Sequence, residues 1–328
     1  MMNDVAVGID VSKKKLDVCI AREGKYKSKV LSNTPNGHKE LIRWLEAQGI
    51  SQEAPVALEA TGPYREAIAI HLSENDWRVS VVNPARISGF AKSELSRNKT
   101  DSADAKLIAR FALHAELEIW QPPTPAIREL RALVDRLQAL SDMKQQELNR
   151  IEGLSETCEV AVKDMIIDHV HWLEKQILSI QSKIDDHIDG NPELKRDADL
   201  IESIPGMGRR ATSQFLAYIG DVRRFKSAKA LAAFIGVTPK QKQSGTSING
   251  RSSLSRTGHN AARKALFMPG MVAKRFNPVI IAASIRLEAR GLTPKAIIGV
   301  SMRKLVHMIY GVMKWCSPQK IDTVPMQR

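Results

Sequence analysis

The sequence predicts an α/β domain at the N-terminus, followed by a helical linker and a mainly α-helical, basic C-terminal domain. Over residues 1–121, short apolar runs alternate with segments of helical spacing. Over residues 122–199, apolar residues recur at every third or fourth position, and over residues 200–328 basic residues far outnumber acidic ones. A chain of 328 residues has room for more than one domain, because single domains usually hold about 100–200 residues.

The first region is predicted to form a sheet whose first three strands can pair in antiparallel fashion. The expected strands are VAVGID (5–10), LDVCIA (16–21) and KSKVLS (27–32). A helix with a glycine stop (35–49), the strand PVALEA, a helix begun by Pro63, the strand RVSVVNP and helical segments over 85–117 follow. This order is that of an RNase H-like sheet, although other α/β folds share it.

The proline-rich break QPPTP (121–125) is predicted to end this domain. Beyond it, a heptad seam is formed by Ile166, Val170, Leu173, Ile177, Ile180 and Ile184. We interpret residues 122–199 as an antiparallel coiled-coil hairpin that also mediates dimerisation; two helices of an ordinary bundle are the alternative. The segment DGNP (189–192) closes the hairpin.

A Pro-Gly-Met-Gly turn between two apolar helices opens the C-terminal region, over LIESIPGMG and ATSQFLAYIG. Backbone N–H groups at such a helix N-terminus bind anions, so we expect a helix-hairpin-helix that grips a nucleic-acid backbone. A plain helical turn is the alternative. FIGVTP (234–239) is interpreted as a second, weaker copy, and KQKQSGTSINGRSSLSRTGHN as a long polar loop before further basic, amphipathic helices.

The net charge of +13 is very unevenly distributed. Residues 1–121 hold 17 Lys and Arg against 16 Asp and Glu, residues 122–200 hold 10 against 16, and residues 201–328 hold 22 against 4. Such a region is typical of a polyanion-binding surface rather than of a merely solvated basic face. The expected nucleic-acid-binding residues are Lys99, Gly206, Gly208, Arg209, Arg210, Lys240, Lys242, Arg251, Arg256 and Arg263.

The composition predicts a cytoplasmic protein that associates with the nucleoid and not with a membrane. The three cysteines are scattered without metal-ligand spacing, which indicates a reducing compartment and disfavours structural zinc. The N-terminus lacks the order of a signal peptide, and no uninterrupted apolar run approaches the ~20 residues of a membrane span.

Four carboxylates stand where a metal site could form. Asp10 and Glu59 each end a predicted buried strand, and Asp101 and Asp104 share one face of a predicted helix. Converging carboxylates are the ligands of two Mg²⁺ ions ~4 Å apart in phosphoryl-transfer sites. Taken singly, each residue has an ordinary alternative, as a turn former, a surface residue or a helix cap; together they predict a two-magnesium centre.

Five segments carry a resemblance to a known family: GIDVSKKKLDV, ALEATGPY, VNPARISGFAKSELSRNKTDSADAKLIARF, SIPGMGRRATSQFLAYIGDVRRF and FIGVTPKQKQSGTSINGRSSLSRTGHNAARKALF. They are similar to the DEDD transposases of insertion-sequence family one-ten. The resemblance implies a RuvC-like domain with Asp10, Glu59, Asp101 and Asp104 as its tetrad. It also implies a coiled-coil linker, and a recombinase guided by a structured bridge RNA that pairs with donor and target DNA.

The resemblance further implies a nucleophilic serine, which falls on Ser244, the first position of the family's SG-x-S loop. A hydroxyl in a flexible, glycine-flanked loop can reach a phosphate. Neighbouring serines lie close by, and Ser247 is the alternative nucleophile. Since no His or Lys beside Ser244 offers itself as a base, we expect activation from a metal site, completed by another subunit of a dimer or a dimer of dimers.

Two rival functions remain open at the level of sequence. One is a RuvC-like nuclease that cleaves branched DNA with metal-activated water, so that no protein becomes joined to DNA. The other is a non-catalytic nucleic-acid-binding protein, which would show no metal-dependent cleavage.

Overall fold

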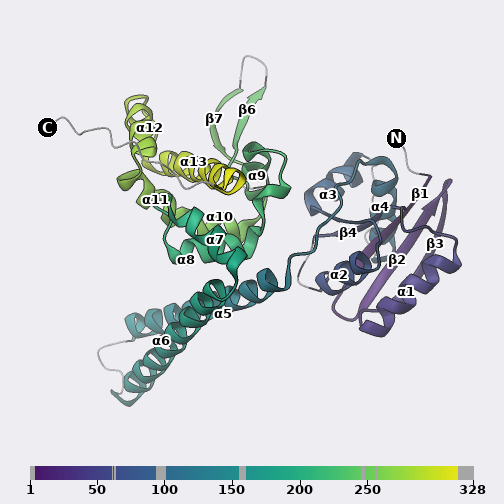
Figure 1. The fold of residues 1–328 in the computed structure, drawn as a ribbon, viewed down its shortest axis with the longest axis horizontal. Helices are drawn as coiled ribbons and strands as arrows, with labels where there is room; N and C mark the ends of the chain where they lie inside the picture. The colour runs from purple at the N-terminus through teal and green to yellow at the C-terminus, as the bar shows by residue number, and fades with distance from the viewer. Residues whose placement is uncertain are drawn as a thin grey trace. The chain divides into compact units, whose positions relative to one another are not determined.

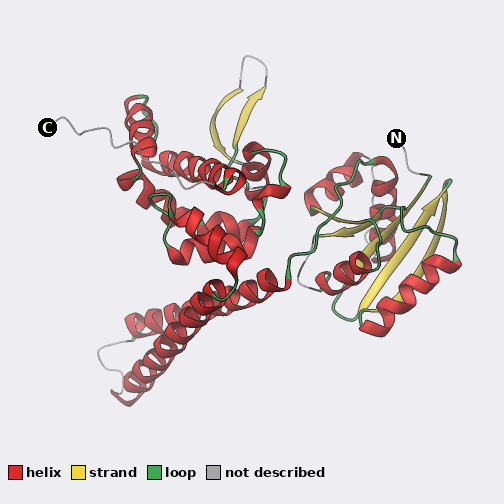
Figure 2. Ribbon diagram, in the orientation of Figure 1, coloured by secondary structure: helices red, strands yellow, loops and turns green. Residues whose placement is uncertain are grey.

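The computed structural model describes residues 4–60, 62, 64–93, 101–154, 160–244, 248–255 and 257–316. The chain divides into two compact units, Met1–Pro122 and Pro123–Arg328. The first unit combines a sheet with helices, and the second is mainly helical (Figure 2).

The N-terminal unit contains a five-stranded mixed sheet in the order β3-β2-β1-β4-β5. Its strands are β1 (Val5–Val11), β2 (Lys15–Arg22), β3 (Lys25–Ser32), β4 (Val56–Glu59) and β5 (Val79–Val82). The first three strands pair antiparallel, and β4 and β5 are parallel to β1. All five predicted strands therefore form, and the first three pair antiparallel as expected.

Helices cover both faces of this sheet (Figure 1). They are α1 (Pro35–Ala47), α2 (Glu66–Glu74), α3 (Pro84–Ser93) and α4 (Asp101–His114). The apolar side chains of α1 and α2 join one core cluster with Ile9 and Leu58 of the sheet. The apolar side chains of α4 pack on the opposite face, where small residues such as Ala6 and Ala57 allow the helix to come close.

The second unit begins with two long helices, α5 (Pro125–Gly153) and α6 (Val160–Asp189), which pack along each other (Figure 1). Thr124 caps α5 by accepting a hydrogen bond from the N–H of Ile127, and Pro125 occupies its first turn. Their direction is antiparallel, because Lys144 pairs with Glu174 at 2.6 Å, whereas His187 near the end of α6 contacts Ala126 at the start of α5.

The remaining helices are α7 (Pro192–Glu202), α8 (Arg209–Ile219), a 3-10 turn η1 (Val222–Arg224), α9 (Ala228–Ile235), α10 (Asn260–Ala265), α11 (Phe267–Phe276), α12 (Pro278–Ala289) and α13 (Pro294–Trp315). One core joins them to α5 and α6, with Leu130 and Val134 packed in the same cluster as Phe215 and Leu305. The expected division at residue 200 is therefore not a boundary between compact units, since α7 runs across it.

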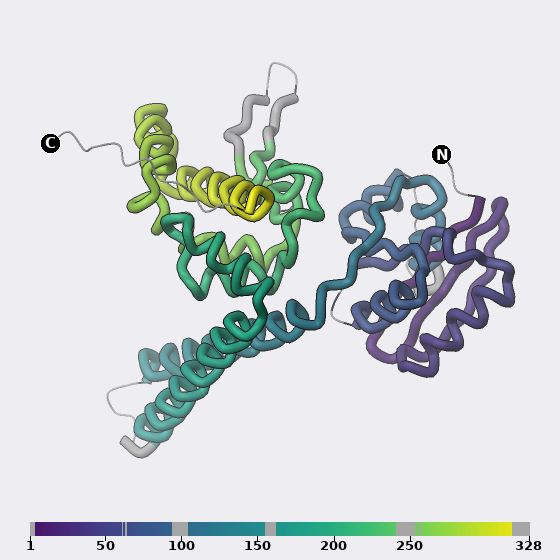
Figure 3. The backbone as a smooth tube through the Cα atoms, in the orientation of Figure 1, coloured from purple at the N-terminus to yellow at the C-terminus, as the bar shows by residue number. Residues whose placement is uncertain are grey.

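A two-stranded hairpin replaces most of the long polar loop that the sequence predicted. Strand β6 (Pro239–Ser244) pairs antiparallel with β7 (Ile248–Leu254), and the hairpin stands out from the helices (Figure 1). The backbone that leads from the helices into its base can be followed in Figure 3. The prediction was wrong because neither strand shows the apolar alternation of a half-buried strand.

The prediction of a second helix-hairpin-helix at FIGVTP was also wrong. Gly236 ends α9 in the left-handed conformation, at φ 82°, and the chain continues into β6 rather than into another helix.

Within the described residues, α13 is the one helix long and apolar enough to cross a membrane by length and composition. Its apolar face, including Leu305 and Ile309, is fully buried in the core of the second unit. The helix therefore has the burial of a core helix in this fold.

Candidate catalytic carboxylates and nucleic-acid-binding residues

The parallel pairing of β1 and β4 brings Asp10 and Glu59 to the same edge of the sheet. In that register Gly8 is opposite Ala57 and Ile9 is opposite Leu58, so the next pair along is Asp10 and Glu59. Side chains two apart in a strand share a face. Asp10 therefore projects to the face of Gly8 and Glu59 to the face of Ala57, which is the face covered by α4. Both carboxylates are half-buried.

Gly8 lets the backbone of α4 lie almost directly on β1. A β-carbon at this position would be 2.9 Å from Cα of Ala109, and nearer still to the N of Ala109 and the carbonyl O of Ala105. These are backbone atoms, which cannot rotate away as a side chain can. Only glycine fits this position without moving the helix.

The direction of α4 places its first turn at the carboxylate edge of the sheet. Ala6 of β1 packs with Ala112 of α4, whereas Gly8, the next residue of β1 on the same face, contacts Ala105, which lies two turns earlier in the helix. Asp10 is the next residue of β1 on this face after Gly8, and Asp101 lies one turn before Ala105 in α4. The two elements thus run antiparallel and bring the two acidic positions to the same end.

The donor set at this edge suits a hard divalent cation, since carboxylate oxygens are the ligands that Mg²⁺ prefers. Asp104 is half-buried in the first turn of α4, three residues after Asp101, whose side chain lies outside the description. Among the side chains that the structure does describe, no three His, Cys, Asp or Glu groups lie close enough to hold a metal ion. The backbone therefore places these residues where a metal site could form, but the described side chains by themselves do not make a complete set of metal ligands.

Sequence reasoning missed a fifth acid beside this edge. Asp17 of β2 lies directly opposite Asp10 in the antiparallel register and is 5% exposed. Directly opposed residues share a face, so Asp17 is on the α4 side as well. Lys15 forms an ion pair with Asp17, with 3.2 Å between Nζ of Lys15 and Oδ2 of Asp17. The available signal was its place in the alternation of LDVCIA, where it interrupts an otherwise apolar face.

The turn between α7 and α8 contains the two glycines expected to face a nucleic-acid backbone. Gly206 has φ +106°, and a β-carbon there would be 2.6 Å from Cβ of Ala273, so both conformation and space require glycine. Gly208 is exposed and is the N-cap of α8, where no side chain caps the helix. Arg210 is exposed in the first turn of α8.

Two of the arginines expected to contact nucleic acid make interactions within the protein. Arg209 bonds Asp185 at 2.9 Å and Asp189 at 3.0 Å, and lies 3.5 Å from Glu202. Burial alone would lower the pKa of the Arg209 guanidinium, but the hydrogen bonds that it donates to Asp185 and Asp189, and the negative charges of Asp189 and Glu202, raise the pKa above its usual value. Arg263 donates to the carbonyl of Ile235 at the end of α9, at 3.0 Å. Both arginines thus hold helices together in this fold.

Ser244 is the last residue of β6, at the outer end of the hairpin, where its backbone pairs with that of Ile248. Lys240 is exposed near the base of the same strand. For Ser244, Lys242 and Arg251 the structure describes the backbone and not the side chain; Ser247, Lys99 and Arg256 lie outside the described residues.

Comparison with known proteins matches both units to one family. The family model of IS110 DEDD transposases, described as "Transposase", matches residues 7–157. The model described as "Transposase IS116/IS110/IS902 family" matches residues 198–284.

Among curated relatives, the pilin gene-inverting protein of Moraxella bovis is 34% identical over 97% of this chain and 98% of its own length. The transposase for insertion sequence element IS1111A of Coxiella burnetii is 25% identical over 50% of this chain and 51% of its own. A solved structure, "T. thermophilus RuvC in complex with Holliday junction substrate", matches 33% of this chain and 90% of that chain at 16% identity and a TM-score of 0.26, which is too low to establish a common fold. The two family models and the full-length relatives show that the chain belongs to the IS110 family of transposases and recombinases.

Proposed function

We propose that this IS110-family protein is a magnesium-dependent, RNA-guided DNA recombinase that cuts and rejoins DNA strands through a serine nucleophile. The observation that supports the proposal is the backbone placement of four acidic positions toward one edge of the sheet. Asp10 and Glu59 lie at adjacent strand ends, and Asp101 and Asp104 lie in the first turn of α4, the helix that packs against Gly8.

In this proposal Asp10, Glu59, Asp101 and Asp104 hold the divalent ions and orient the scissile phosphate. Bound there, the ions would supply Lewis-acid stabilisation of the negative charge that develops on the phosphate. The carboxylates themselves repel a bare phosphate, so they favour DNA at this edge only when cations are bound. Binding to the basic second unit does not depend on them, and this separates chemistry from affinity.

Ser244 is proposed as the attacking group, on the strength of the family resemblance and its place at the end of a projecting strand. Its Oγ would form a bond to phosphorus and lose its proton. The bond from phosphorus to a deoxyribose oxygen would break, and that oxygen would leave as a hydroxyl. One phosphodiester is exchanged for another without water, so the bond energy is kept for religation.

The proposed partners are donor DNA, target DNA and a structured bridge RNA. The 22 basic against 4 acidic residues over 201–328 support binding of a polyanion, although charge alone does not distinguish RNA from DNA. We also propose a helix-hairpin-helix at the α7–α8 turn and a homo-oligomer formed along the coiled-coil pair α5–α6. Apolar side chains exposed on α6, such as Trp172 and Leu178, support the last point.

Trapping the covalent intermediate tests this function directly. Purified protein, with the RNA that copurifies with it sequenced and added back, is incubated with donor DNA and magnesium, then denatured. We expect a DNA–protein adduct whose linked nucleotide maps to the peptide containing Ser244. Ser244→Ala should abolish the adduct and recombination, whereas Ser253→Ala, an exposed serine on the paired strand β7, should retain both.

The possible results separate the rival readings. A linked nucleotide on Ser247 would move the nucleophile within the same hairpin. Recombination without any adduct would refute the serine mechanism, and cleavage alone, without rejoining, would favour a RuvC-like nuclease that uses activated water. No metal-dependent cleavage at all would leave a nucleic-acid-binding protein.

A second candidate function is inversion of a DNA segment. It is favoured by the relative from Moraxella bovis, which is named for inverting a pilin gene and matches almost the whole chain. Inversion and transposition use the same strand chemistry and differ in how the recombining sites are oriented. A plasmid assay with sites in inverted and in direct orientation distinguishes them.

A further inference from the structure

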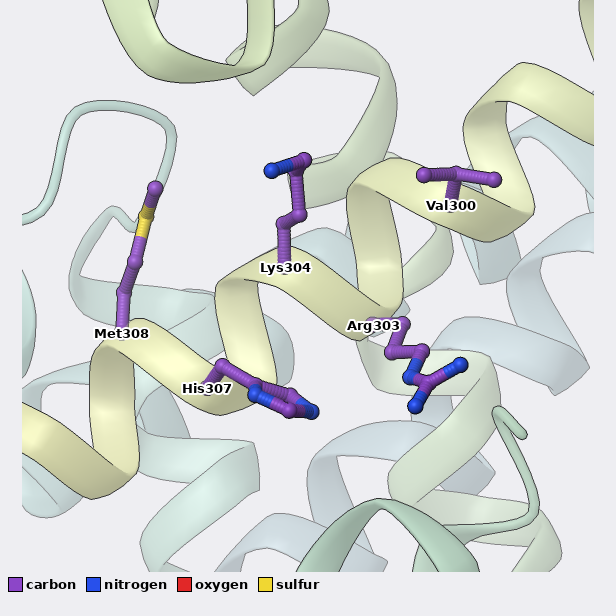
Figure 4. A pocket seen from close by; sticks show the side chains of 5 residues that line it. All are labelled: Val300, Arg303, Lys304, His307 and Met308. Carbon is purple, nitrogen blue, oxygen red and sulfur yellow. The ribbon is translucent and has the colours of Figure 1, made fainter. Parts of the chain in front are cut away.

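A hollow of about 480 Å³ on the surface of α13 is lined by basic side chains that no predicted site includes. Its lining residues are Val300, Arg303, Lys304, His307 and Met308. Figure 4 shows Arg303 and His307 leaving the helix on one side and Lys304 and Met308 on the other. The volume lies in the range of ligand sites, which run from ~300 to ~1,000 Å³.

The positive charge of this hollow is not balanced by acids. Of the four acidic residues in 201–328, Glu202 pairs with Arg209, Asp221 with Arg223 and Glu288 with Lys274, and the fourth lies outside the described residues. Within the described chain, Arg303 and Lys304 make no ion pair. Lys229, exposed on α9, adds a third positive charge close enough to act on His307.

His307 marks the inner part of the hollow as a place for an acceptor. Its Nε2 is buried and has no hydrogen-bond partner in the described structure. Burial, and then the charges of Arg303, Lys304 and Lys229, lower the pKa of the His307 imidazole below its ordinary value of 6.5. An anion placed here would supply the missing partner and offset the mutual repulsion of the cations.

We infer that the hollow lined by Arg303, Lys304 and His307, with the charge of Lys229 nearby, is a binding site for one backbone phosphate of a nucleic acid. The inference rests on the proposed nucleic-acid binding by the second unit and adds a specific site to it. The hollow lies at the foot of the β6–β7 hairpin, because Leu254, the last residue of β7, packs at 3.2 Å from where a β-carbon of Gly299 would be, one residue before Val300. A strand held here is therefore held next to the element that carries Ser244.

The test measures binding of the full-length protein, without divalent metal, to labelled duplex DNA and to single-stranded RNA of equal length. Arg303→Gln/Lys304→Gln removes two charges from the hollow. Arg290→Gln/Lys295→Gln removes two charges from exposed positions at the α12–α13 connection and is the matched control. The slope of log affinity against log salt is measured for each variant.

Loss of one phosphate contact should lower that slope by about 0.9 for duplex DNA and about 0.7 for a single strand. If the wild type and the variant bind equally at 1 M salt, a slope difference of 0.9 means that the variant binds about eightfold more weakly than the wild type at 0.1 M salt. The control should change the slope by clearly less. If the slope changes only for DNA or only for RNA, the bound phosphate belongs to that polymer. If the slope changes for both, the site accepts a phosphate from either polymer.

Equal slopes for the hollow variant and the control would overturn the inference, provided that the wild type binds. If the wild type binds neither probe, the proposed nucleic-acid binding itself fails. Lys229→Gln changes an exposed position on α9 and tests the same inference if the double variant unfolds. It should weaken binding in the same direction, whereas Arg303→Lys, which keeps the charge, should retain most of the slope.

Discussion

Replacing Gly8 with alanine should separate catalysis from nucleic-acid binding, although Gly8 carries no chemical group of its own. The new β-carbon would lie 2.9 Å from Cα of Ala109, and nearer to two other backbone atoms of α4, whereas ordinary contacts begin at 3.4 Å. The helix must therefore move away from β1 by about 1 Å, since no side chain can absorb the overlap.

That displacement has two calculable consequences. Overpacking of a tight core contact costs about 1–3 kcal/mol of unfolding free energy. Because Asp101 and Asp104 travel with α4 while Asp10 stays on the strand, the acidic positions separate by about the same 1 Å, and a misplacement of this size can cost about 100-fold in rate. Binding through the second unit should be unchanged.

The assay combines strand-cleavage rate, DNA affinity and thermal unfolding, with Gly89→Ala as the control. Gly89 lies exposed within α3 with open space around it, so alanine there should leave cleavage unchanged and raise stability by about 0.5–1 kcal/mol. Wild-type cleavage and stability in the Gly8→Ala protein would refute the close approach of α4 to β1. Loss of DNA binding would show that the two functions are not separable.

Three further outcomes are expected. Asp10→Asn should abolish cleavage but leave DNA affinity within about twofold. The control Asp76→Asn, at an exposed left-handed position that suits asparagine, should retain cleavage. Near-normal cleavage by Asp10→Asn would show that Asp10 is not a metal ligand. A fragment of residues 123–328, which has its own core, should bind DNA with strong salt dependence in gel-shift titrations, and salt-insensitive binding would contradict the charge argument. The pKa of His307 is depressed in the folded protein, so the unfolded state binds more protons below about pH 6.5 and the free energy of unfolding should fall as the pH falls through that window. In denaturant titrations His307→Gln should flatten this pH dependence. Identical pH profiles for the wild type and the variant would show that the imidazole is not desolvated.

The sheet of the first unit was predictable because local chemistry and tertiary environment agree there. Buried strands must be apolar, and each predicted run became a strand with its ends within a few residues of the prediction. Acidic residues directly after such runs, as at Asp10 and Glu59, are conspicuous because a buried strand rarely ends on a charge without a reason. The β6–β7 hairpin was missed for the opposite reason, since polar strands carry no alternation.

The sequence by itself determined the two-part chemistry of this protein: an acidic strand-end pattern in one region and a concentrated positive charge in the other. Both follow from residue identity, which folding does not alter. Only the tertiary structure decided which groups meet. It set the direction in which α4 crosses β1 at Gly8, and it paired Arg209 with three carboxylates. In the described structure it gave Arg303, Lys304 and Lys229 no carboxylate partner. These outcomes depend on packing between elements far apart in the chain, and residue spacing along the sequence carries no record of such contacts.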